Sequence, residues 1–240
     1  MMPGVNADEI DVEVLPDGGA LAARAADLVA ERLAKALSAR GVASLAVSGG
    51  STPRPFLAEL AGRTVPWAAV HVFQVDERVA PAGHPDRNLT DLRTALLDRV
   101  PIPSGNIHPM PVEADDLDAA AAAYAGEVRA VTGDARLDVV HLGLGDDGHT
   151  ASWPPGDPVV DAAAPVAVAG PFNGRLRMTL TPPAVNGAGW IVWLIAGDAK
   201  APVVARLLAG DPALPASRVR RHDVTLLADA ATGAGLRPES

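Results

Sequence analysis

The chain has 240 residues, with 29 acidic side chains against 20 Lys and Arg, no cysteine and a formal net charge of −9. This length suits one large α/β domain with a substantial core. The lack of cysteine excludes disulfides, Cys-ligated zinc and a thiol nucleophile, and the acidic balance argues against nucleic acid or a membrane surface as partner.

The amino-terminal segment is acidic and has no basic stretch followed by an apolar run, unlike a secretory signal. The longest strongly apolar run covers residues 190–196 and is far too short to span a bilayer. We therefore expect a cytoplasmic protein without a membrane partner.

Apolar periodicity predicts the secondary structure along the chain. Gly41 and Gly133 follow two of the helical patterns and are typical helix-ending residues. The expected elements, in chain order, are strand 10–15, helix 18–40, strand 44–47, helix 53–60, strand 70–75, helices 88–99 and 115–131, strands 137–142, 165–169, 176–180 and 190–196, helix 198–208 and strand 224–228.

Strands alternate with helices throughout this prediction, which favours an α/β fold with a doubly wound, mostly parallel sheet and helices on both faces. We expect a single domain over residues 1–240, with room for a small lobe at residues 100–135. Ligands of such sheets bind beyond the carboxyl ends of the strands. Four polar segments follow predicted strands and should form one site there: residues 48–52, 76–78, 143–150 and 197–200.

The first of these segments joins the strand at 44–47 to the helix at 53–60. The two glycines allow the backbone to approach a ligand closely, Ser51 or Thr52 can cap the helix, and the free N–H groups of the first turn attract an anion. No Gly-Lys-Ser/Thr follows, so the segment is not a nucleotide P-loop. An ordinary strand–turn–helix would look the same. The segment reads Ser48-Gly49-Gly50-Ser51-Thr52.

The loop at 143–148 contains a literal G-x-G-x-x-G. Its two carboxylates, Asp146 and Asp147, would repel a pyrophosphate, and the prolines at 154 and 155 prevent a long helix from beginning there. We therefore expect no dinucleotide cofactor.

His149 ends the same glycine-rich loop and has Asp147 two residues before it. A carboxylate at that spacing can orient an imidazole and stabilise its charged form, which makes His149 a candidate general base. Two alternatives stay open: a structural histidine, and a metal site built from Asp146, Asp147 and His149 with Asp76 or Glu77. We expect no metal.

Several other side chains at predicted strand ends carry charge. Arg78 can bind a phosphate or a developing oxyanion, and Asp76 can accept hydrogen bonds from hydroxyl groups. Arg177 and Lys200 are further candidates for an anion, although a surface position would explain Lys200 equally well. The remaining histidines show no partner pattern and are interpreted as structural or surface residues; they are His71, His84, His108, His141 and His222.

Several stretches of the chain form an ordered set of motifs: VSGGSTP (47–53), VDERVAP (75–81) followed by Asp86-Arg87-Asn88, GLGDDGHTAS (143–152), RMTLTPPAVNGA (177–188), AGDAKAPVV (196–204) and LPAS (214–217). With these stretches the chain resembles the 6-phosphogluconolactonase family, and they occur in the family's order over about residues 45 to 220. The chain departs from the family pattern at Trp153-Pro154-Pro155, where the family usually has a Leu-Phe-Pro type sequence.

The resemblance implies hydrolysis of 6-phospho-D-glucono-1,5-lactone in the pentose phosphate pathway, without a cofactor, by a monomer or small homo-oligomer. It implies His149 and Asp147 as catalytic residues. Two alternatives remain: a sugar-phosphate isomerase or deaminase of similar fold, and a non-enzymatic sugar-phosphate sensor. The deaminases have a glutamate at the position where this chain has Pro154. The implied substrate-binding residues are Ser48, Gly49, Gly50, Ser51, Thr52, Asp76, Arg78, Asn88, Arg177 and Lys200.

Overall fold

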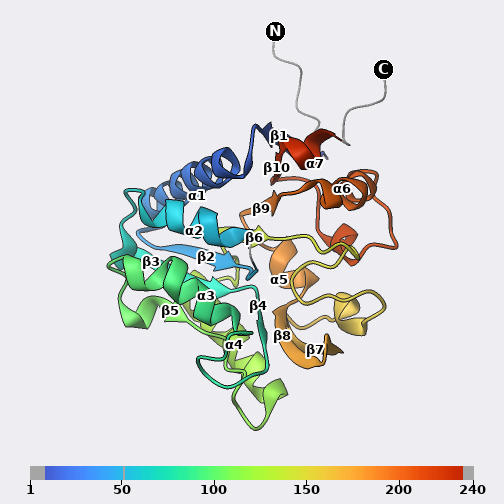
Figure 1. The fold of residues 1–240 in the computed structure, drawn as a ribbon. Helices are drawn as coiled ribbons and strands as arrows, with labels where there is room; N and C mark the ends of the chain where they lie inside the picture. The colour runs from blue at the N-terminus through green and yellow to red at the C-terminus, as the bar shows by residue number, and fades with distance from the viewer. Residues whose placement is uncertain (1–8, 51, 235–240) are drawn as a thin grey trace.

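The computed structural model describes residues 9–50 and 52–234 and shows one α/β domain built around a seven-stranded parallel sheet (Figure 1). The strand order is β1-β10-β9-β6-β2-β3-β5, and a separate three-stranded antiparallel sheet has the order β4-β8-β7. The strands are β1 (Asp11–Leu15), β2 (Ala43–Val47), β3 (Val70–Gln74), β4 (Asp76–Arg78), β5 (Ile107–His108), β6 (Val139–Leu142), β7 (Val166–Phe172), β8 (Arg175–Leu180), β9 (Trp190–Ile195) and β10 (Val224–Asp229). The helices are α1 (Gly18–Arg40), α2 (Pro53–Ala61), α3 (Asn88–Ala95), α4 (Leu117–Thr132), α5 (Pro182–Asn186), α6 (Ala201–Leu208) and α7 (Ala230–Gly233).

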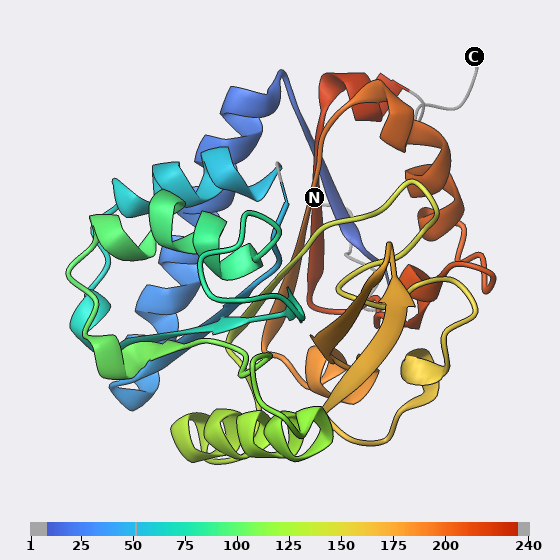
Figure 2. The ribbon, with the colours of Figure 1, turned by 60° about the horizontal axis from the view of Figure 1, so that its bottom comes forward.

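The large sheet separates two hydrophobic cores, as the predicted doubly wound fold requires. Along β9, Trp193 faces the core beneath α4 and α6, whereas its neighbours Val192 and Leu194 face the core beneath α1, α2 and α3. Because both faces are covered, the strand reads as a continuous apolar run rather than an alternating one. Figure 2 shows α4 on the opposite side of the sheet from α1.

Local signals fix α1 as predicted. The side chain of Asp17 accepts a hydrogen bond from the backbone N–H of Ala20 at 2.8 Å and caps the first turn. At the other end Gly41 adopts the left-handed conformation, with φ of 74°, and its N–H donates to the carbonyl of Leu37. The helix packs along α2 and lies on the parallel sheet.

The strict alternation of strands and helices was wrong for β7 and β8. These two strands form an antiparallel hairpin with Asn173-Gly174 as its two-residue turn, and both turn residues have positive φ. Asn-Gly is the strongest local signal for such a turn, because both residues tolerate that backbone conformation. The hairpin pairs through β8 with β4, so residues 76–78 form a short strand instead of a solvated turn.

Two predicted helices are shorter than expected. Residues 88–99 divide into α3 and a 3₁₀ turn, Leu97–Arg99, since Leu96 at φ −134° and ψ −63° leaves the helical region. Likewise a 3₁₀ turn, Asp198–Lys200, precedes α6. The short elements β4, β5, α5 and α7 were not predicted.

Residues 100–135 form no separate lobe. Tyr124 and Val128 of α4 are buried in the core beneath the sheet. The hydroxyl of Tyr124 accepts a hydrogen bond from the backbone N–H of Gln74 at 2.8 Å, which ties α4 to the end of β3. Within residues 9–50 and 52–234, none of the helices combines the length and apolar character needed to cross a membrane.

Candidate active site

A cavity of about 360 Å³ lies beyond the carboxyl ends of β2, β6 and β9, beside the small sheet. Its walls bring together the polar segments that the sequence analysis singled out. Ser51 lies outside the described residues, and Asp147 lies behind the wall, against His149. The sequence-predicted residues in the wall are Ser48, Gly49, Gly50, Thr52, Asp76, Arg78, Asn88, His149, Arg177 and Lys200.

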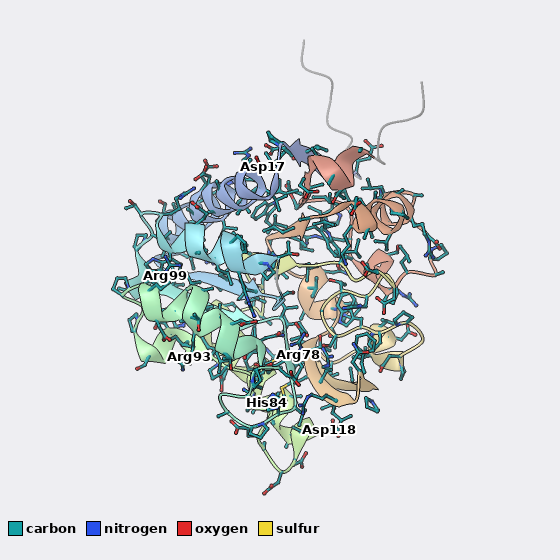
Figure 3. The ribbon with its side chains drawn as sticks, in the orientation of Figure 1. Asp17, Arg78, His84, Arg93, Arg99 and Asp118 are labelled. Atoms are coloured by element: carbon teal, nitrogen blue, oxygen red, sulfur yellow. The ribbon has the colours of Figure 1, made fainter. Side chains whose placement is uncertain are left out.

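A larger cavity, of about 640 Å³, lies between α3 and the segment that precedes α4. Its walls include Arg93, Met110 and Glu113 but no histidine and none of the glycine-rich turns. Figure 3 shows Arg93 and Arg99 on the α3 side of the molecule, whereas Arg78 lies between α3 and the β7–β8 hairpin. The smaller cavity is therefore the candidate active site.

His149 and Asp147 form a hydrogen-bonded pair at the rim of this cavity. Nδ1 of His149 lies 2.6 Å from Oδ1 of Asp147, and the same oxygen accepts the backbone N–H of His149 at 3.1 Å. Burial alone would raise the pKa of Asp147, but these hydrogen bonds outweigh burial and hold the pKa below its usual value. The carboxylate is therefore ionised and only accepts, so Nδ1 carries the proton and Nε2 is the basic nitrogen.

Gly145 makes room for the imidazole. A Cβ at this position would lie 2.1 Å from Nδ1 of His149, far inside van der Waals contact. On its other side the imidazole meets the ring of Phe172, edge-on, with 5.2 Å between centroids. The loop and the end of β7 thus both contact the ring. No local pattern in the sequence indicated a role for Phe172.

Two guanidinium groups face each other across the small sheet. Arg78 of β4 and Arg177 of β8 are direct cross-strand partners. Burial lowers the pKa of Arg177, and the positive charge of Arg78 lowers it further. The Nε atoms of both side chains are buried without a hydrogen-bond partner among the described residues. Two adjacent cations with unused donors form a site for an anion.

Backbone carbonyl groups hold these two arginines in place. Arg78 donates from Nη1 to the carbonyl of Asp86 at 2.6 Å, and Arg177 donates from Nη2 to the carbonyl of Phe172 at 3.3 Å. The guanidinium of Arg177 also lies over the Phe172 ring, 5.3 Å from its centroid. Phe172 therefore contacts both the imidazole and one of the cations.

Asp76 is buried and points into the cavity beside the arginines. Its Oδ2 accepts a hydrogen bond from the hydroxyl of Ser152 at 2.7 Å, and its Oδ1 accepts from Nδ2 of Asn88 at 3.3 Å. Ser152 was predicted only as part of the matched stretch, because nothing local shows that its partner Asp76 lies 76 residues away.

Lys200 connects two loops at the far side of the cavity. Its Nζ lies 2.6 Å from Oδ1 of Asp146 and donates to the carbonyl of Leu144 at 2.7 Å. Asp146 is thus occupied by a cation, and Asp147 by His149. Over the described part of the chain, no three or more His, Cys, Asp or Glu side chains converge as metal ligands.

The turn that begins at Ser48 rests on His141 of β6. The backbone N–H of Ser48 donates to Nδ1 of His141 at 3.3 Å, and its hydroxyl donates to the carbonyl of His141 at 3.1 Å. Complete burial lowers the pKa of His141 to about 3, so this histidine is neutral near pH 7. His141 is structural, in agreement with the interpretation from sequence, but it supports the glycine-rich turn directly.

Thr52 does not cap α2 as the sequence suggested. It already has helical dihedrals, φ −63° and ψ −41°, and its side chain makes no capping hydrogen bond. A capping residue normally has an extended conformation, which brings its oxygen back to the N–H groups of the first turn. The first turn of α2 therefore has no side-chain cap from Thr52, although Thr52 lines the cavity.

The departure from the family pattern at residue 153 leads into the core. Trp153 is fully buried, and its Nε1 donates to the carbonyl of Leu180 on β8 at 2.7 Å. The segment after His149 is thereby attached to the small sheet.

Comparison with known proteins agrees with this architecture. The family model described as glucosamine-6-phosphate isomerases/6-phosphogluconolactonase matches residues 16–228. A 6-phosphogluconolactonase of Nostoc sp. is 39% identical over 234 residues, which cover 94% of this chain and 98% of the relative. The crystal structure of the Thermotoga maritima 6-phosphogluconolactonase has a TM-score of 0.83 at 28% identity, covering 92% of this chain and 99% of that one.

A monomeric glucosamine-6-phosphate deaminase superposes with a TM-score of 0.84, covering 95% of this chain and 100% of that one. Its identity is 22%, which shows a shared fold alone. The family match and the Nostoc relative both span nearly the whole chain. This chain therefore belongs to the glucosamine-6-phosphate isomerase/6-phosphogluconolactonase family.

Proposed function

We propose that this protein hydrolyses 6-phospho-D-glucono-1,5-lactone to 6-phospho-D-gluconate. Relatives named 6-phosphogluconolactonase match almost the entire chain. The observation that carries the proposal is the convergence, in one cavity, of a carboxylate-held imidazole and two adjacent guanidinium groups. The imidazole suits ester hydrolysis, and the guanidinium groups suit a phosphorylated substrate.

His149 acts first as a general base. Its Nε2 takes a proton from a water molecule while the oxygen of that water attacks the lactone carbonyl carbon. The carboxylate of Asp147 stabilises the imidazolium that results, because it accepts the Nδ1–H at 2.6 Å. In this proposal the pair therefore activates water directly.

Collapse of the tetrahedral intermediate completes the reaction. The carbonyl re-forms, the bond from the carbonyl carbon to the ring oxygen breaks, and the imidazolium of His149 returns its proton to that oxygen. The products are a free hydroxyl and a carboxylic acid, which loses a proton at neutral pH. Donors around the cavity, the backbone N–H groups of the glycine-rich loops among them, stabilise the oxyanion while it exists.

Arg78 and Arg177 bind the phosphate. A phosphate dianion can accept hydrogen bonds from the Nε donors of both side chains. Its negative charge also offsets the repulsion between the two guanidinium groups. Lys200 already uses two of its three N–H donors on Asp146 and the carbonyl of Leu144, so it has at most one donor left for the substrate at the far wall. On a chain of net charge −9, this local positive site also attracts the anionic substrate.

The direct test follows acid release when the purified protein meets freshly prepared 6-phosphogluconolactone, with a His149→Ala variant and a buffer blank measured in parallel. Enzymatic release well above the blank, lost in the variant, supports the proposal. A rate equal to the blank would refute it. Ammonia release from glucosamine 6-phosphate in place of lactone hydrolysis would identify a deaminase, and sugar-phosphate binding without turnover would identify a sensor.

The proposed reaction belongs to the oxidative pentose phosphate pathway, and we place the protein in the cytoplasm as a monomer or small homo-oligomer. Light scattering on the size-exclusion peak measures the mass of the particle. A particle much larger than a few copies of the chain would contradict this assembly.

A further inference from the structure

Glu77 is a fully buried carboxylate one residue away from two cavity residues. It lies on β4 between Asp76 and Arg78, and successive side chains of a strand point to opposite faces. Asp76 and Arg78 line the cavity, whereas Glu77 turns toward the start of α3. We propose that Glu77 is a positioning residue for the lactone hydrolysis, acting through Asn88; this inference rests on the proposed function.

Four hydrogen-bond donors and the guanidinium of Arg87 surround the two carboxylate oxygens. Oε1 accepts the backbone N–H groups of Arg78 at 2.8 Å and of Asn88 at 2.7 Å. Oε2 accepts Nε2 of Gln74 at 2.8 Å and the backbone N–H of Leu89 at 2.9 Å, and Nε of Arg87 lies 3.0 Å from it. Each of these polar neighbours presents an N–H group to the carboxyl oxygens, which serve only as acceptors here.

The same contacts fix where α3 begins. The residue that precedes the helix, Arg87, makes no side-chain cap, and the first free N–H groups of α3 are those of Asn88 and Leu89. Glu77 accepts both N–H groups. A carboxylate on β4 therefore caps α3 and docks the helix against that strand. The first residue of α3 is also the residue that enters the cavity.

In the carboxamide of Asn88, the nitrogen has a hydrogen-bond partner and the oxygen has none among the described residues. Its Nδ2 donates to the carbonyl of Asp76 at 2.9 Å, while its Oδ1 is buried and has no hydrogen-bond partner among the described residues. Gly49 packs directly against it: a Cβ at position 49 would lie 1.9 Å from Oδ1. The geometry leaves Oδ1 as a fixed acceptor at the cavity wall, suited to a substrate hydroxyl.

A Glu77→Gln substitution keeps the shape of the side chain and replaces one oxygen by an NH₂ group. Either orientation of the amide places that NH₂ against at least two N–H donors, since Oε1 and Oε2 each face two or more. The start of α3 must then move, and Asn88 moves with it. A hydroxyl contact remote from the reacting carbonyl is made equally before and during the reaction, so its loss raises KM rather than lowering kcat.

The experiment compares steady-state kinetics on fresh 6-phosphogluconolactone for the wild type, Glu77→Gln, Asn88→Ala and the double variant. We expect KM to rise about 10-fold in Glu77→Gln, the effect of one lost hydrogen bond. We expect a similar rise in Asn88→Ala and less than about 3-fold further change in the double variant, because the two substitutions remove one contact.

Asp138→Asn is the matched control. Asp138 is a partly buried carboxylate that, like Glu77, accepts several donors, among them the N–H and hydroxyl of Ser44, but it lies at the amino end of the large sheet. Its substitution should lower the free energy of unfolding and leave KM unchanged, because unfolding reduces the number of active molecules but does not change how the folded ones bind substrate. If Glu77→Gln fails to fold, Glu77→Asp, which keeps the charge but cannot reach both N–H groups of α3, takes its place.

An unchanged KM in the folded Glu77 variant, an equal rise in Asp138→Asn, or fully multiplicative effects of Glu77 and Asn88 would each overturn the inference. These results are distinct from failure of the proposed function, in which the wild type itself would show no lactonase activity.

Discussion

Arg78 and Arg177 stand directly opposite each other in the antiparallel pairing of β4 with β8, although they are far apart in the chain. The pairing holds two like charges together, partly buried, and Arg78 contributes to the lowered pKa of Arg177. Such an arrangement is unfavourable until an anion binds, so the free protein is prepared for its ligand at some cost in stability.

Removal of Arg177 should therefore select against the phosphorylated substrate. We expect Arg177→Met to raise KM for 6-phosphogluconolactone about 10- to 100-fold, the effect of a lost charge-assisted hydrogen bond. KM for unphosphorylated gluconolactone should change far less. Arg206→Met, which removes the same charge from a partly exposed ion pair with Asp211, is the control. Equal losses on both lactones would show that Arg177 does not bind the phosphate.

The imidazole carries the chemical step. His149→Ala should lower kcat by about 10² to 10⁴ without loss of the folded state, because general base catalysis contributes that much. Initial rates on fresh lactone and circular dichroism check the two halves of this prediction. His222→Ala, at an exposed position, should keep wild-type turnover. A folded His149 variant with normal kcat would remove this residue from the mechanism.

Gly145→Ala tests the placement of the ring rather than its presence. The new Cβ would lie 2.1 Å from Nδ1 of His149, so the imidazole must move. Because a displacement of about 1 Å can cost 10²-fold in rate, we expect kcat to fall at least about 10-fold. Gly126→Ala, in the open interior of α4, should keep activity and gain about 1 kcal/mol of stability. Normal turnover in Gly145→Ala would show that the loop can adapt.

Acid should destabilise the fold through His141. Burial lowers its pKa from 6.5 to about 3, so between these values the unfolded chain binds a proton that the folded chain does not. The free energy of unfolding therefore falls as pH decreases below about 6.5, by about 2 kcal/mol from this residue at pH 5. Burial also lowers the pKa of His71 and His108, which adds to the same trend.

Urea denaturation at pH 7.5 and pH 5 measures this dependence. The His141→Asn variant should be less stable at pH 7.5 but should lose less stability on acidification than the wild type, because no proton can bind at position 141. The exposed His222→Asn variant should retain the wild-type dependence. Identical pH dependence in His141→Asn would assign the acid sensitivity to other groups.

Treatment with EDTA should leave the rate on fresh lactone unchanged. The side chains proposed as metal ligands have other partners, since Asp146 pairs with Lys200 and Asp147 pairs with His149. Activity lost to the chelator and restored by a stoichiometric divalent cation would require a different mechanism.

The sequence predicted those features whose signals are local. The apolar runs at β2, β6 and β9 indicated buried parallel strands, and the two-residue spacing of Asp147 and His149 placed both in one loop. It also placed Arg78 at the end of a strand, where a parallel sheet collects its ligand-binding residues. Short-range patterns were sufficient in these cases because neighbouring residues make the contacts.

Contacts between distant segments could not be predicted in this way. Nothing near Arg177 shows that β8 leaves the large sheet to pair with β4, or that Ser152 donates to Asp76. The Asn173-Gly174 pair is a local turn signal, but the alternation of strands and helices along the rest of the chain favoured a parallel arrangement. The sequence likewise shows that Lys200 is charged but does not show that its partner is Asp146.

The two sheets supply different functional groups to the site. The loop after β6 of the seven-stranded sheet supplies His149, whereas Arg78 and Arg177 belong to the three-stranded sheet. Changes in the β7–β8 hairpin that keep Phe172 against the imidazole can therefore alter which acid group the protein recognises, while His149 and Asp147 keep their places in the loop after β6. Related proteins can therefore differ in the acid group that they bind and still activate water with the same histidine and aspartate.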